Sequence, residues 1–349
     1  MSSSQIPVRP KVSSFARDLA TRVQHKKRIL LSGPVRPDED SVGACLALAR
    51  GIRFISSAHV DVAGDLLHGF SWLPETENAV PDAEVTPDYD MVIILDGDKT
   101  RLVRTVDDAF AAAQTKGIVD HHISTDINGY DIVLLDPTAA STCDLVYEIL
   151  LSWDCPLDAD TACLLYAGLV YDTGGFRYLN TTPATHIFAS ELLKTGFDHA
   201  HVNVKVLSER TRSGLRVMSH LLTHTEFLAD GMVALGSLSL DDFERLGGQK
   251  GDTVGIIDAL LFTQGVIVAC IINEKSRGLD GNQPAVSISL RSRSNTDPEI
   301  DVSRLAQEMN PNGGGHARAA GAMVNETLDT VRTRIHSVLM NSLEEAVTS

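Results

Sequence analysis

Four apolar segments of this chain each stop at an acidic residue or a histidine, and this repeated ending limits the fold more than any other feature. The segments end, in chain order, at Pro37-Asp38-Glu39-Asp40, at Asp96, at Asp120-His121-His122 and at Tyr171-Asp172. Parallel strands in an open α/β sheet direct their carboxyl ends, and the loops beyond them, toward one ligand-binding crevice. The pattern therefore predicts an α/β fold in which these carboxylates and imidazoles converge on one site.

Strand-like and helix-like patterns alternate through the first half of the chain, with strands expected over 28–32, 91–95 and 117–119. Such alternation is typical of a doubly wound, mostly parallel sheet. After about residue 195 the pattern changes to one long helix, 204–224, followed by strand-like runs and a last helix near 327–346. We therefore predict a second, smaller α/β domain, with the active-site cleft between the two domains.

The expected domain organisation has four parts, which follow the change of pattern along the chain. They are a flexible tail over 1–14, a metal-binding domain over 15–200, a linker helix over 201–225 and a second α/β domain over 226–349. A length of 349 residues is enough for two domains of ordinary size.

The composition narrows the range of partners and locations. A net charge of −16 argues against a surface that coats long duplex DNA, which needs clustered Lys and Arg. The first ten residues lack the apolar core of a signal peptide, and no apolar run approaches the ~20 residues of a membrane span. The five cysteines form no C-x-x-C pair, which is typical of reduced thiols. We expect a cytoplasmic protein without membrane partners.

The cluster of acids and histidines has the composition of a metal site. Carboxylate oxygens dominate it and imidazole nitrogens are a minority, a mixture that suits Mn²⁺ or Mg²⁺ better than zinc. Each residue also has an ordinary explanation: Asp40 alone is better explained as the N-cap of a helix, and Asp96 before Gly97 as a turn residue. These explanations would have to coincide at four successive segment ends, so the sequence favours a metal site.

A second candidate site lies in the C-terminal half, in the run Gly313-Gly314-Gly315-His316. Glycines allow backbone N–H groups to approach an anion closely, and His316 with Arg318 could add charge-assisted hydrogen bonds to a phosphate. Arg291, at the end of an alternating strand, could join them. The alternative is a flexible loop that contains a histidine by chance.

Together these motifs resemble the DHH phosphoesterase superfamily, which is named after its Asp-His-His, in its nanoRNase and pAp-phosphatase (NrnA-type) branch with a DHHA1-type C-terminal domain. The resemblance extends from about residue 15 to about residue 345. It implies two metal ions with these ligands: Asp38 at the first ion, Asp40, His121 and Asp172 at the second, and Asp96 at both. It also implies that His122 is a general acid or hydrogen-bond donor at the substrate phosphate, and that Asp120 orients His121.

The resemblance implies a phosphoric ester hydrolase that uses a metal-activated water and one or two Mn²⁺ ions, with Mg²⁺ as the other candidate. Its substrates would be short oligoribonucleotides, linear dinucleotides or 3′-phosphoadenosine 5′-phosphate (pAp). The far phosphate or nucleotide would be held by Arg291, Gly313, Gly314, Gly315, His316 and Arg318. The sequence leaves open whether the chain forms a homodimer.

One position departs from the family pattern. The first motif of the family has a histidine four residues before its first aspartate, where this chain has Pro34. Proline has no side-chain donor for a metal, so the first ion keeps only Asp38 and Asp96. This departure supports one alternative, a nucleotide-binding regulatory protein with weakened catalysis. A second alternative, which does not depend on Pro34, is a RecJ-type exonuclease. The acidic charge and the lack of an obvious extra nucleic-acid domain disfavour the second alternative.

Overall fold

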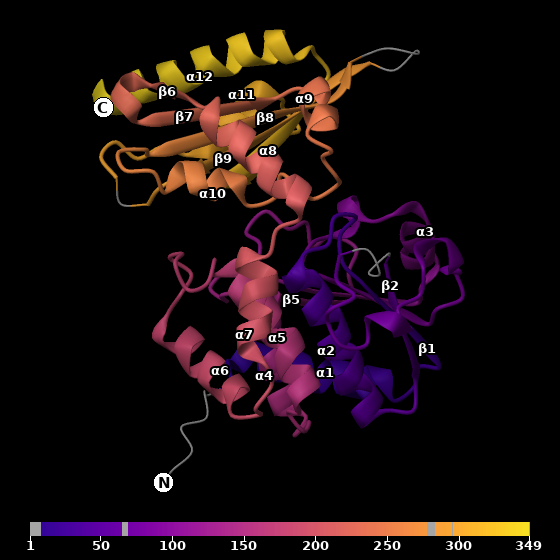
Figure 1. Cartoon of the computed structure of the whole chain (residues 1–349). Helices are drawn as coiled ribbons and strands as arrows, with labels where there is room; N and C mark the ends of the chain where they lie inside the picture. Colours follow the sequence, from indigo (N-terminus) through magenta and orange to yellow (C-terminus); the bar gives the residue numbers. More distant parts are fainter. Residues whose placement is uncertain (1–7, 65–68, 278–282, 295, 349) are drawn as a thin grey trace. The chain divides into compact units, whose positions relative to one another are not determined.

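The computed structural model describes residues 8–64, 69–277, 283–294 and 296–348. The chain divides between Glu209 and Arg210 into two compact units, unit 1 and unit 2 (Figure 1). Each unit has its own β-sheet and its own hydrophobic core, which confirms the α/β class predicted for both halves. None of the helices in the described part of the chain is long and apolar enough to cross a membrane.

The sheet of unit 1 has five parallel strands in the order β2-β1-β3-β4-β5. Their bounds are β1 Arg28–Ser32, β2 His59–Ala63, β3 Met91–Leu95, β4 Thr115–Asp120 and β5 Ile132–Leu135. All five residues of β3 are buried, as expected for a parallel strand with helices on both faces. This is the doubly wound sheet that the sequence predicts, and it brings the carboxyl ends of β3 and β4 side by side.

Helices cover both faces of this sheet. They are α1 Pro10–Val23, α2 Glu39–Ile55, α3 Arg104–Ala112, α4 Thr142–Ser152, α5 Ala159–Asp172, α6 Pro183–Leu193 and α7 His199–Asn203. Helices α1, α2, α4 and α5 share one core with the sheet residues Leu31 and Ile93, whereas α3 packs against Val92 and Ile94 on the other face. The larger core therefore lies on the side of the sheet that carries α2, α4 and α5.

Helices α2 and α5 pack very closely, and two glycines make this possible. A Cβ atom on Gly168 of α5 would lie 2.5 Å from both Asp40 Oδ1 and Cys143 Sγ. A Cβ atom on Gly43 of α2 would lie 2.4 Å from the carbonyl oxygen of Leu164. Because real Cβ atoms do not approach other atoms so closely, only glycine allows this packing, and the packing places the start of α2 beside α4.

The flexible tail predicted over 1–14 is wrong for its last five residues, because α1 begins at Pro10; residues 1–7 lie outside the described residues. Proline is favoured in the first turn of a helix, and Val12 is completely buried in the core of unit 1. The residue before the helix, Arg9, forms ion pairs with Asp136, Asp144 and Glu148. Burial of α1 and these ion pairs tie the segment to unit 1.

Unit 2 contains a mixed sheet in the order β10-β11-β9-β8-β7-β6, in which β7 and β8 are parallel and the other neighbours antiparallel. The strands are β6 Glu226–Leu228, β7 Val233–Leu238, β8 Val268–Arg277, β9 Pro284–Ser292, β10 Gly314–His316 and β11 Ala319–Val324. The helices are α8 Arg212–Thr223, α9 Leu240–Arg245, α10 Ile256–Leu261, α11 Val302–Met309 and α12 Leu328–Thr348. Helices α11 and α12 cover one face, whereas α8 and α10 cover β7 and β8 on the other (Figure 1).

The single helix predicted over 204–224 is wrong, because the chain leaves the helical conformation between the two units. A π-helical turn, Val204–Ser208, follows α7, and α8 begins only at Arg212. The hydroxyl of Thr211 accepts a hydrogen bond from the N–H of Gly214 and donates one to Asp252 Oδ1. Threonine at this position therefore caps a new helix instead of continuing the old one.

We predict that Gly168→Ala destabilises unit 1, because its methyl group would overlap Asp40 and Cys143. Overpacking of this kind costs about 1–3 kcal/mol of unfolding free energy. Chemical denaturation of the full chain measures the cost. The matched control is Ser190→Ala, on an exposed position of α6, which should change stability by less than about 0.5 kcal/mol. Equal stability of both variants would contradict the close packing of α2 and α5.

Candidate metal centre

The candidate site lies at the carboxyl edge of the unit 1 sheet. Asp96 follows β3 directly in the left-handed conformation, with φ of 61°, and Gly97 after it has φ of 149°. Asp120 is the last residue of β4, and Asp172 is the last residue of α5. The structure thereby brings together most of the predicted metal ligands, together with both histidines of the Asp120-His121-His122 tripeptide.

Asp40 is held by the N-terminus of α4. Its carboxylate is completely buried and accepts hydrogen bonds from the backbone N–H groups of Thr142 (2.7 Å) and Cys143 (2.9 Å). The positive end of a helix dipole favours a negative group in this position. The interpretation of Asp40 as an N-cap is wrong, because Asp38 caps α2 by accepting from the N–H groups of Asp40 and Ser41.

His121 and Asp172 provide the clearest sign of a cation. His121 Nε2 lies 3.0 Å from Asp172 Oδ2 and 3.7 Å from Asp96 Oδ1. Nε2 and Oδ2 are both buried, and apart from this mutual contact neither has a hydrogen-bond partner among the described residues. Ligand atoms of Asp40, His121 and Asp172 all lie within 4.8 Å of one another. A divalent cation would satisfy these buried polar atoms, so the residues fit a metal site.

Asp120 contacts the imidazole ring of His122, whereas it contacts His121, which the sequence predicted it to orient, through the backbone N–H. Asp120 Oδ1 lies 2.8 Å from His122 Nδ1 and accepts the backbone N–H groups of both histidines. Asp120 Oδ2 accepts a hydrogen bond from the hydroxyl of Thr125. The difference arises because the tight turn after β4 folds the His122 ring back onto Asp120, whereas the Nε2 atom of His121 is directed toward Asp172.

Asp38 and Pro34 define the weaker side of the site. Asp38 is absent from both groups of potential metal ligands that the described residues form, although Asp96 belongs to one of them. Its Oδ1 atom is used to cap α2. A Cβ atom on Gly97 would lie 3.6 Å from Pro34 Cβ, so the proline ring stands next to the Asp96 loop. An apolar ring thus occupies this edge of the acidic cluster.

The buried carboxylates hold their protons unusually tightly. Burial, and then repulsion from Asp96 and Asp172, raises the pKa of Asp38 to about 8. Burial, and then repulsion from Asp40, raises the pKa of Asp96 to about 8. Burial and the neighbouring Asp172 raise the pKa of Asp40 to about 7. Without a cation, these carboxyl groups therefore cannot all be ionised at neutral pH without cost.

The pKa values of the two histidines are also raised, which for an imidazole favours the charged form. Burial by itself would lower the pKa of His121, but the contact with Asp172 and the charges of Asp40 and Asp96 outweigh it and raise that pKa to about 10. Burial is likewise outweighed at His122, whose pKa is raised by Asp120 and Asp96. The protonated imidazoles therefore supply part of the positive charge that the cluster needs.

The predicted phosphate-binding residues of unit 2 separate into two groups. Arg291, Ala319 and His316 are successive partners across β9, β11 and β10, so Arg291 and His316 share one face of the sheet. Gly314 and Gly315 lie on β10, directly after Gly313. The guanidinium of Arg318 instead contacts Glu299 at 2.8 Å and donates to the carbonyl oxygen of Ile300. Arg318 is therefore engaged in a separate network.

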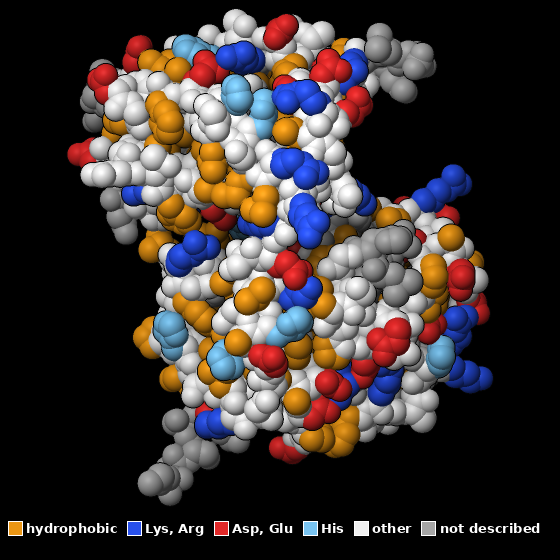
Figure 2. Space-filling view, viewed as in Figure 1, with side chains coloured by type: hydrophobic (Ala, Val, Ile, Leu, Met, Phe, Trp, Pro, Cys, Tyr) orange, Lys and Arg blue, Asp and Glu red, His pale blue; other side chains and the backbone are white. Residues whose placement is uncertain are grey.

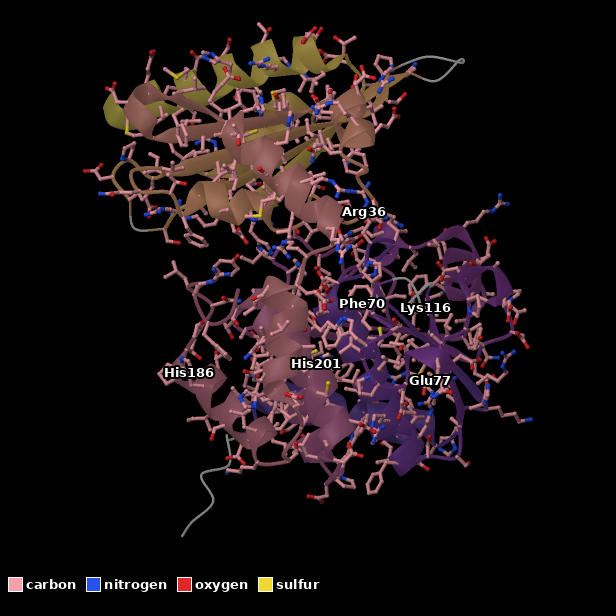
Figure 3. All side chains as sticks on the ribbon, viewed as in Figure 1. Arg36, Phe70, Glu77, Lys116, His186 and His201 are labelled. Carbon is pink, nitrogen blue, oxygen red and sulfur yellow. The ribbon has the colours of Figure 1, made fainter. Side chains whose placement is uncertain are left out.

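Other polar features of unit 1 do not extend the metal centre. His186 and His201 are exposed on α6 and α7 (Figure 3), each against an aromatic ring, Phe176 and Trp72 respectively. Neither belongs to a group of potential metal ligands among the described residues. These two histidines are therefore surface residues.

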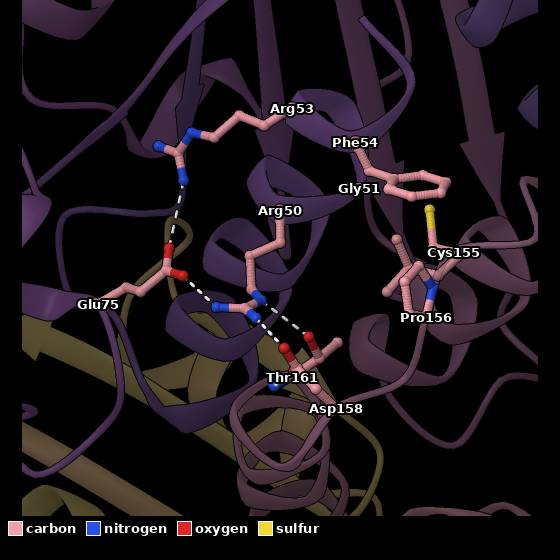
Figure 4. Close-up of a pocket in the computed structure, with 10 residues that line it drawn as sticks. Arg50, Gly51, Arg53, Phe54, Glu75, Cys155, Pro156, Asp158 and Thr161 are labelled. Atoms are coloured by element: carbon pink, nitrogen blue, oxygen red, sulfur yellow. Dashed lines mark hydrogen bonds and ion pairs between the residues drawn. The ribbon is translucent and has the colours of Figure 1, made fainter.

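A cavity of about 350 Å³ opens at the far end of α2 and includes none of the site residues (Figure 4). Its two cations are already paired: Arg50 contacts Glu75 and Asp158, and Arg53 contacts Glu75. Arg50 also donates to the hydroxyl of Thr161 at 2.8 Å. These contacts tie α2 to the start of α5, so a structural role explains them.

The backbone amides that hold Asp40 were not predicted from the sequence. A signal for them was present, because Ser141 before the apolar run of α4 is an N-cap pattern. Ser141 does cap α4, accepting from the N–H of Asp144 at 3.1 Å. What the pattern could not reveal is that a carboxylate from α2 would lie at that helix end.

The comparisons with known proteins cover almost the whole chain. The model of the DHH family, N-terminal domain, matches residues 28–169, and the model of the DHHA1 domain matches residues 242–341. The bifunctional oligoribonuclease and PAP phosphatase NrnA of Thermus thermophilus is 26% identical over 320 residues, which are 91% of either chain. Its namesake from Bacillus subtilis is 24% identical and covers 85% of this chain and 89% of its own length.

Solved structures show the same fold. An exopolyphosphatase-related protein from Bacteroides fragilis superposes with a TM-score of 0.81 at 24% identity, covering 96% of this chain and 97% of its own. Exonuclease RecJ bound to manganese gives a TM-score of 0.52 at 15% identity, covering 95% of this chain and 94% of its own. The fold is thus that of an α/β protein with two units joined in this order.

The two family models together span most of the chain, so the chain belongs to the DHH/DHHA1 family. Within that family its similarity is to the NrnA-type branch, as the named relatives show. The resemblance drawn from the sequence motifs is confirmed.

We predict that the metal-free chain becomes less stable as the pH rises from about 6 to 8. In this range the folded chain binds more protons than the unfolded chain, because the pKa values of Asp38, Asp40, Asp96 and His121 are all raised. Stability therefore falls with pH. Thermal unfolding with a chelator measures the slope, and saturating Mn²⁺ should reverse it, since a cation replaces the lost protons.

The matched variant for this experiment is Asp40→Asn. It removes one buried charge and should make the stability of the metal-free chain depend less on pH. Stability that rises between pH 6 and 8 in the chelated chain, or a slope that Mn²⁺ leaves unchanged, would contradict the described charge balance.

Proposed function

We propose that this chain is a Mn²⁺-dependent phosphodiesterase and phosphatase that acts on short oligoribonucleotides, linear dinucleotides or pAp. The coarser part, a phosphoric ester hydrolase, follows from family membership and from the activities named for its relatives. The observation that carries the finer part is the buried group formed by Asp40, His121 and Asp172, in which His121 Nε2 and Asp172 Oδ2 lie 3.0 Å apart. Cation binding explains such a buried polar cluster better than a purely structural role does.

The side chains that would hold the ion are Asp40, Asp96, His121 and Asp172. A bound Mn²⁺ would lower the pKa of a water molecule and offset negative charge on a phosphoryl group. The amides of α4 donate to both oxygens of the Asp40 carboxyl group and fix it in position, so one ligand is preorganised. Oxygen ligands with one imidazole favour Mn²⁺ or Mg²⁺, and the manganese in the RecJ structure fits this choice.

His122 is proposed as the residue that donates a proton or a hydrogen bond to the substrate phosphate. Asp120 contacts its Nδ1 atom, which fixes the ring and stabilises the imidazolium form. A protonated imidazole can donate to a phosphoryl or leaving oxygen as negative charge develops there. Asp120 is thus a positioning residue for His122.

Short substrates suit the charge distribution. Long single strands bind along grooves lined with basic and aromatic side chains. This chain has a net charge of −16 and 5% aromatic residues. On the face drawn in Figure 2, Lys and Arg side chains are interspersed with acidic and hydrophobic ones. A cytoplasmic location is proposed as well, since all five cysteines are free thiols.

A nucleotide-binding regulator with weak catalysis is the second candidate. The proline ring beside the Asp96 loop and the use of Asp38 as a helix cap favour it, because they leave few ligands for a further ion. The two candidates differ in turnover: the regulator would bind pAp or a dinucleotide and release it unchanged in the presence of Mn²⁺.

We predict that Asp172→Ala lowers hydrolysis of pAp and of a dinucleotide at least about a hundredfold, because it removes a ligand that contacts His121. The assay uses the full chain with Mn²⁺, and circular dichroism checks the fold. The control is Asp160→Ala, an exposed acid in the first turn of the same helix, which should keep the activity. Full activity of Asp172→Ala would refute the proposed site.

We predict that Arg291→Leu weakens substrate binding rather than the chemical step. Loss of a charge-assisted contact to a phosphate costs about 1.5–3 kcal/mol. The loss should appear in KM, with kcat nearly unchanged, if the contact is equal in the ground and transition states. The matched control is Arg293→Leu, whose guanidinium is held by the carbonyl oxygens of Leu261 and Thr263. A fall in kcat at constant KM would place Arg291 in the chemistry itself.

A further inference from the structure

Thr142, the first residue of α4, contacts two candidate metal ligands that the chain supplies from different elements. Its backbone N–H donates to Asp40 Oδ2 at 2.7 Å, and its hydroxyl donates to Asp96 Oδ1 at 3.2 Å. Asp40 lies in the first turn of α2, whereas Asp96 follows β3 directly. Thr142 is completely buried, so water does not compete for either contact at this residue. One residue therefore connects two ligands that are distant in the sequence.

Helix α4 does not need the hydroxyl of Thr142 for its own cap. Ser141 is the N-cap, and its hydroxyl accepts the N–H of Asp144 at 3.1 Å. The N–H of Thr142 is one of the first donors of the helix, which have no partner within it, and it is directed to Asp40 instead. The contact with Asp96, rather than helix capping, thus accounts for a hydroxyl group at this position.

The side chain of Asp96 is the less firmly held of the two carboxylates. Its backbone N–H donates to the carbonyl oxygen of Val119 at 3.1 Å, which fixes the main chain against β4. Its Oδ1 atom lies 3.7 Å from both His121 Nε2 and His122 Nδ1. At 3.7 Å neither nitrogen is within hydrogen-bonding distance, whereas the hydroxyl of Thr142 is. The orientation of the Asp96 carboxylate therefore depends on Thr142.

The residue type suits this role. Threonine is branched at Cβ, so its side chain has few rotamers and the hydroxyl is held in one direction. When Asp96 is ionised, as a metal ligand must be, its carboxylate can only accept hydrogen bonds, and the hydroxyl must donate. A valine at this position would have nearly the same shape and would lack the donor.

We propose that Thr142 is a positioning residue of the metal centre, whose hydroxyl fixes Asp96 in the orientation in which it and Asp40 hold one cation. The inference rests on the proposed function, which requires a cation there, and deepens it by adding a residue that acts through two ligands. Loss of a hydrogen-bond partner of a metal ligand typically weakens metal binding by about 10–100-fold.

The experiment measures the Mn²⁺ affinity of the full, chelator-treated chain by calorimetric titration. Thr142→Val removes the hydroxyl but keeps the backbone N–H, and it should weaken the affinity at least about tenfold. Thr142→Ser keeps the hydroxyl and should remain within about threefold of the wild type. The matched control is Thr76→Val, because Thr76 is also buried in unit 1 and its hydroxyl donates to the carbonyl oxygen of Leu73 at 3.0 Å. The control should keep the wild-type affinity.

A second measurement does not depend on the metal. Chemical denaturation of the chelated chain gives a double-mutant cycle of Thr142→Val with Asp96→Ala. The destabilisation caused by Thr142→Val should become smaller once Asp96 is replaced, because the hydroxyl has then lost its acceptor.

Three results would overturn the proposal: wild-type affinity in Thr142→Val, equal losses in Thr142→Val and Thr142→Ser, or an equal loss in Thr76→Val. If the wild type binds no Mn²⁺, the proposed function fails instead. The double-mutant cycle then still tests whether the hydroxyl holds Asp96, and additive effects of the two substitutions would overturn that role.

Discussion

The candidate metal centre of unit 1 depends on one interaction, in which two backbone amides at the N-terminus of α4 donate to the buried Asp40 carboxylate. A carboxylate completely removed from water is costly unless its oxygens are hydrogen-bonded. The amides meet this requirement only because α2 lies against α4 and α5, which Gly168 permits. The close packing of α2 against α4 and α5 and the position of the Asp40 carboxylate therefore depend on each other.

The same packing creates an excess of negative charge that the protein alone balances only in part. Asp38, Asp40 and Asp96 have raised pKa values, and His121 keeps a proton well above its usual range because of Asp172. A cluster that binds protons in place of a cation is stabilised further when a cation arrives. Folding of unit 1 and binding of a metal are thus expected to be coupled through the same few side chains.

Much of this could be predicted from the sequence, because apolar runs that end at acids follow from the burial of parallel strands. The strands over 28–32 and 91–95 lie where the pattern indicated, and the predicted strand over 117–119 lies within β4. The predictions that failed depended on contacts between residues that are distant in the sequence. The capture of Asp40 by α4, the turn of His122 toward Asp120 and the break at Thr211, held by Asp252, cannot be read from local periodicity.

The atoms around His121 are expected to form a cation site, because His121 belongs to both groups of potential ligands among the described residues. Calorimetric titration of the full, chelator-treated chain with Mn²⁺ tests this most directly, with His121→Ala and the surface variant His186→Ala beside it. We expect one tightly bound ion in the wild type and in His186→Ala, and loss of tight binding in His121→Ala. Tight binding that survives in His121→Ala, or no binding to the wild type, would contradict it.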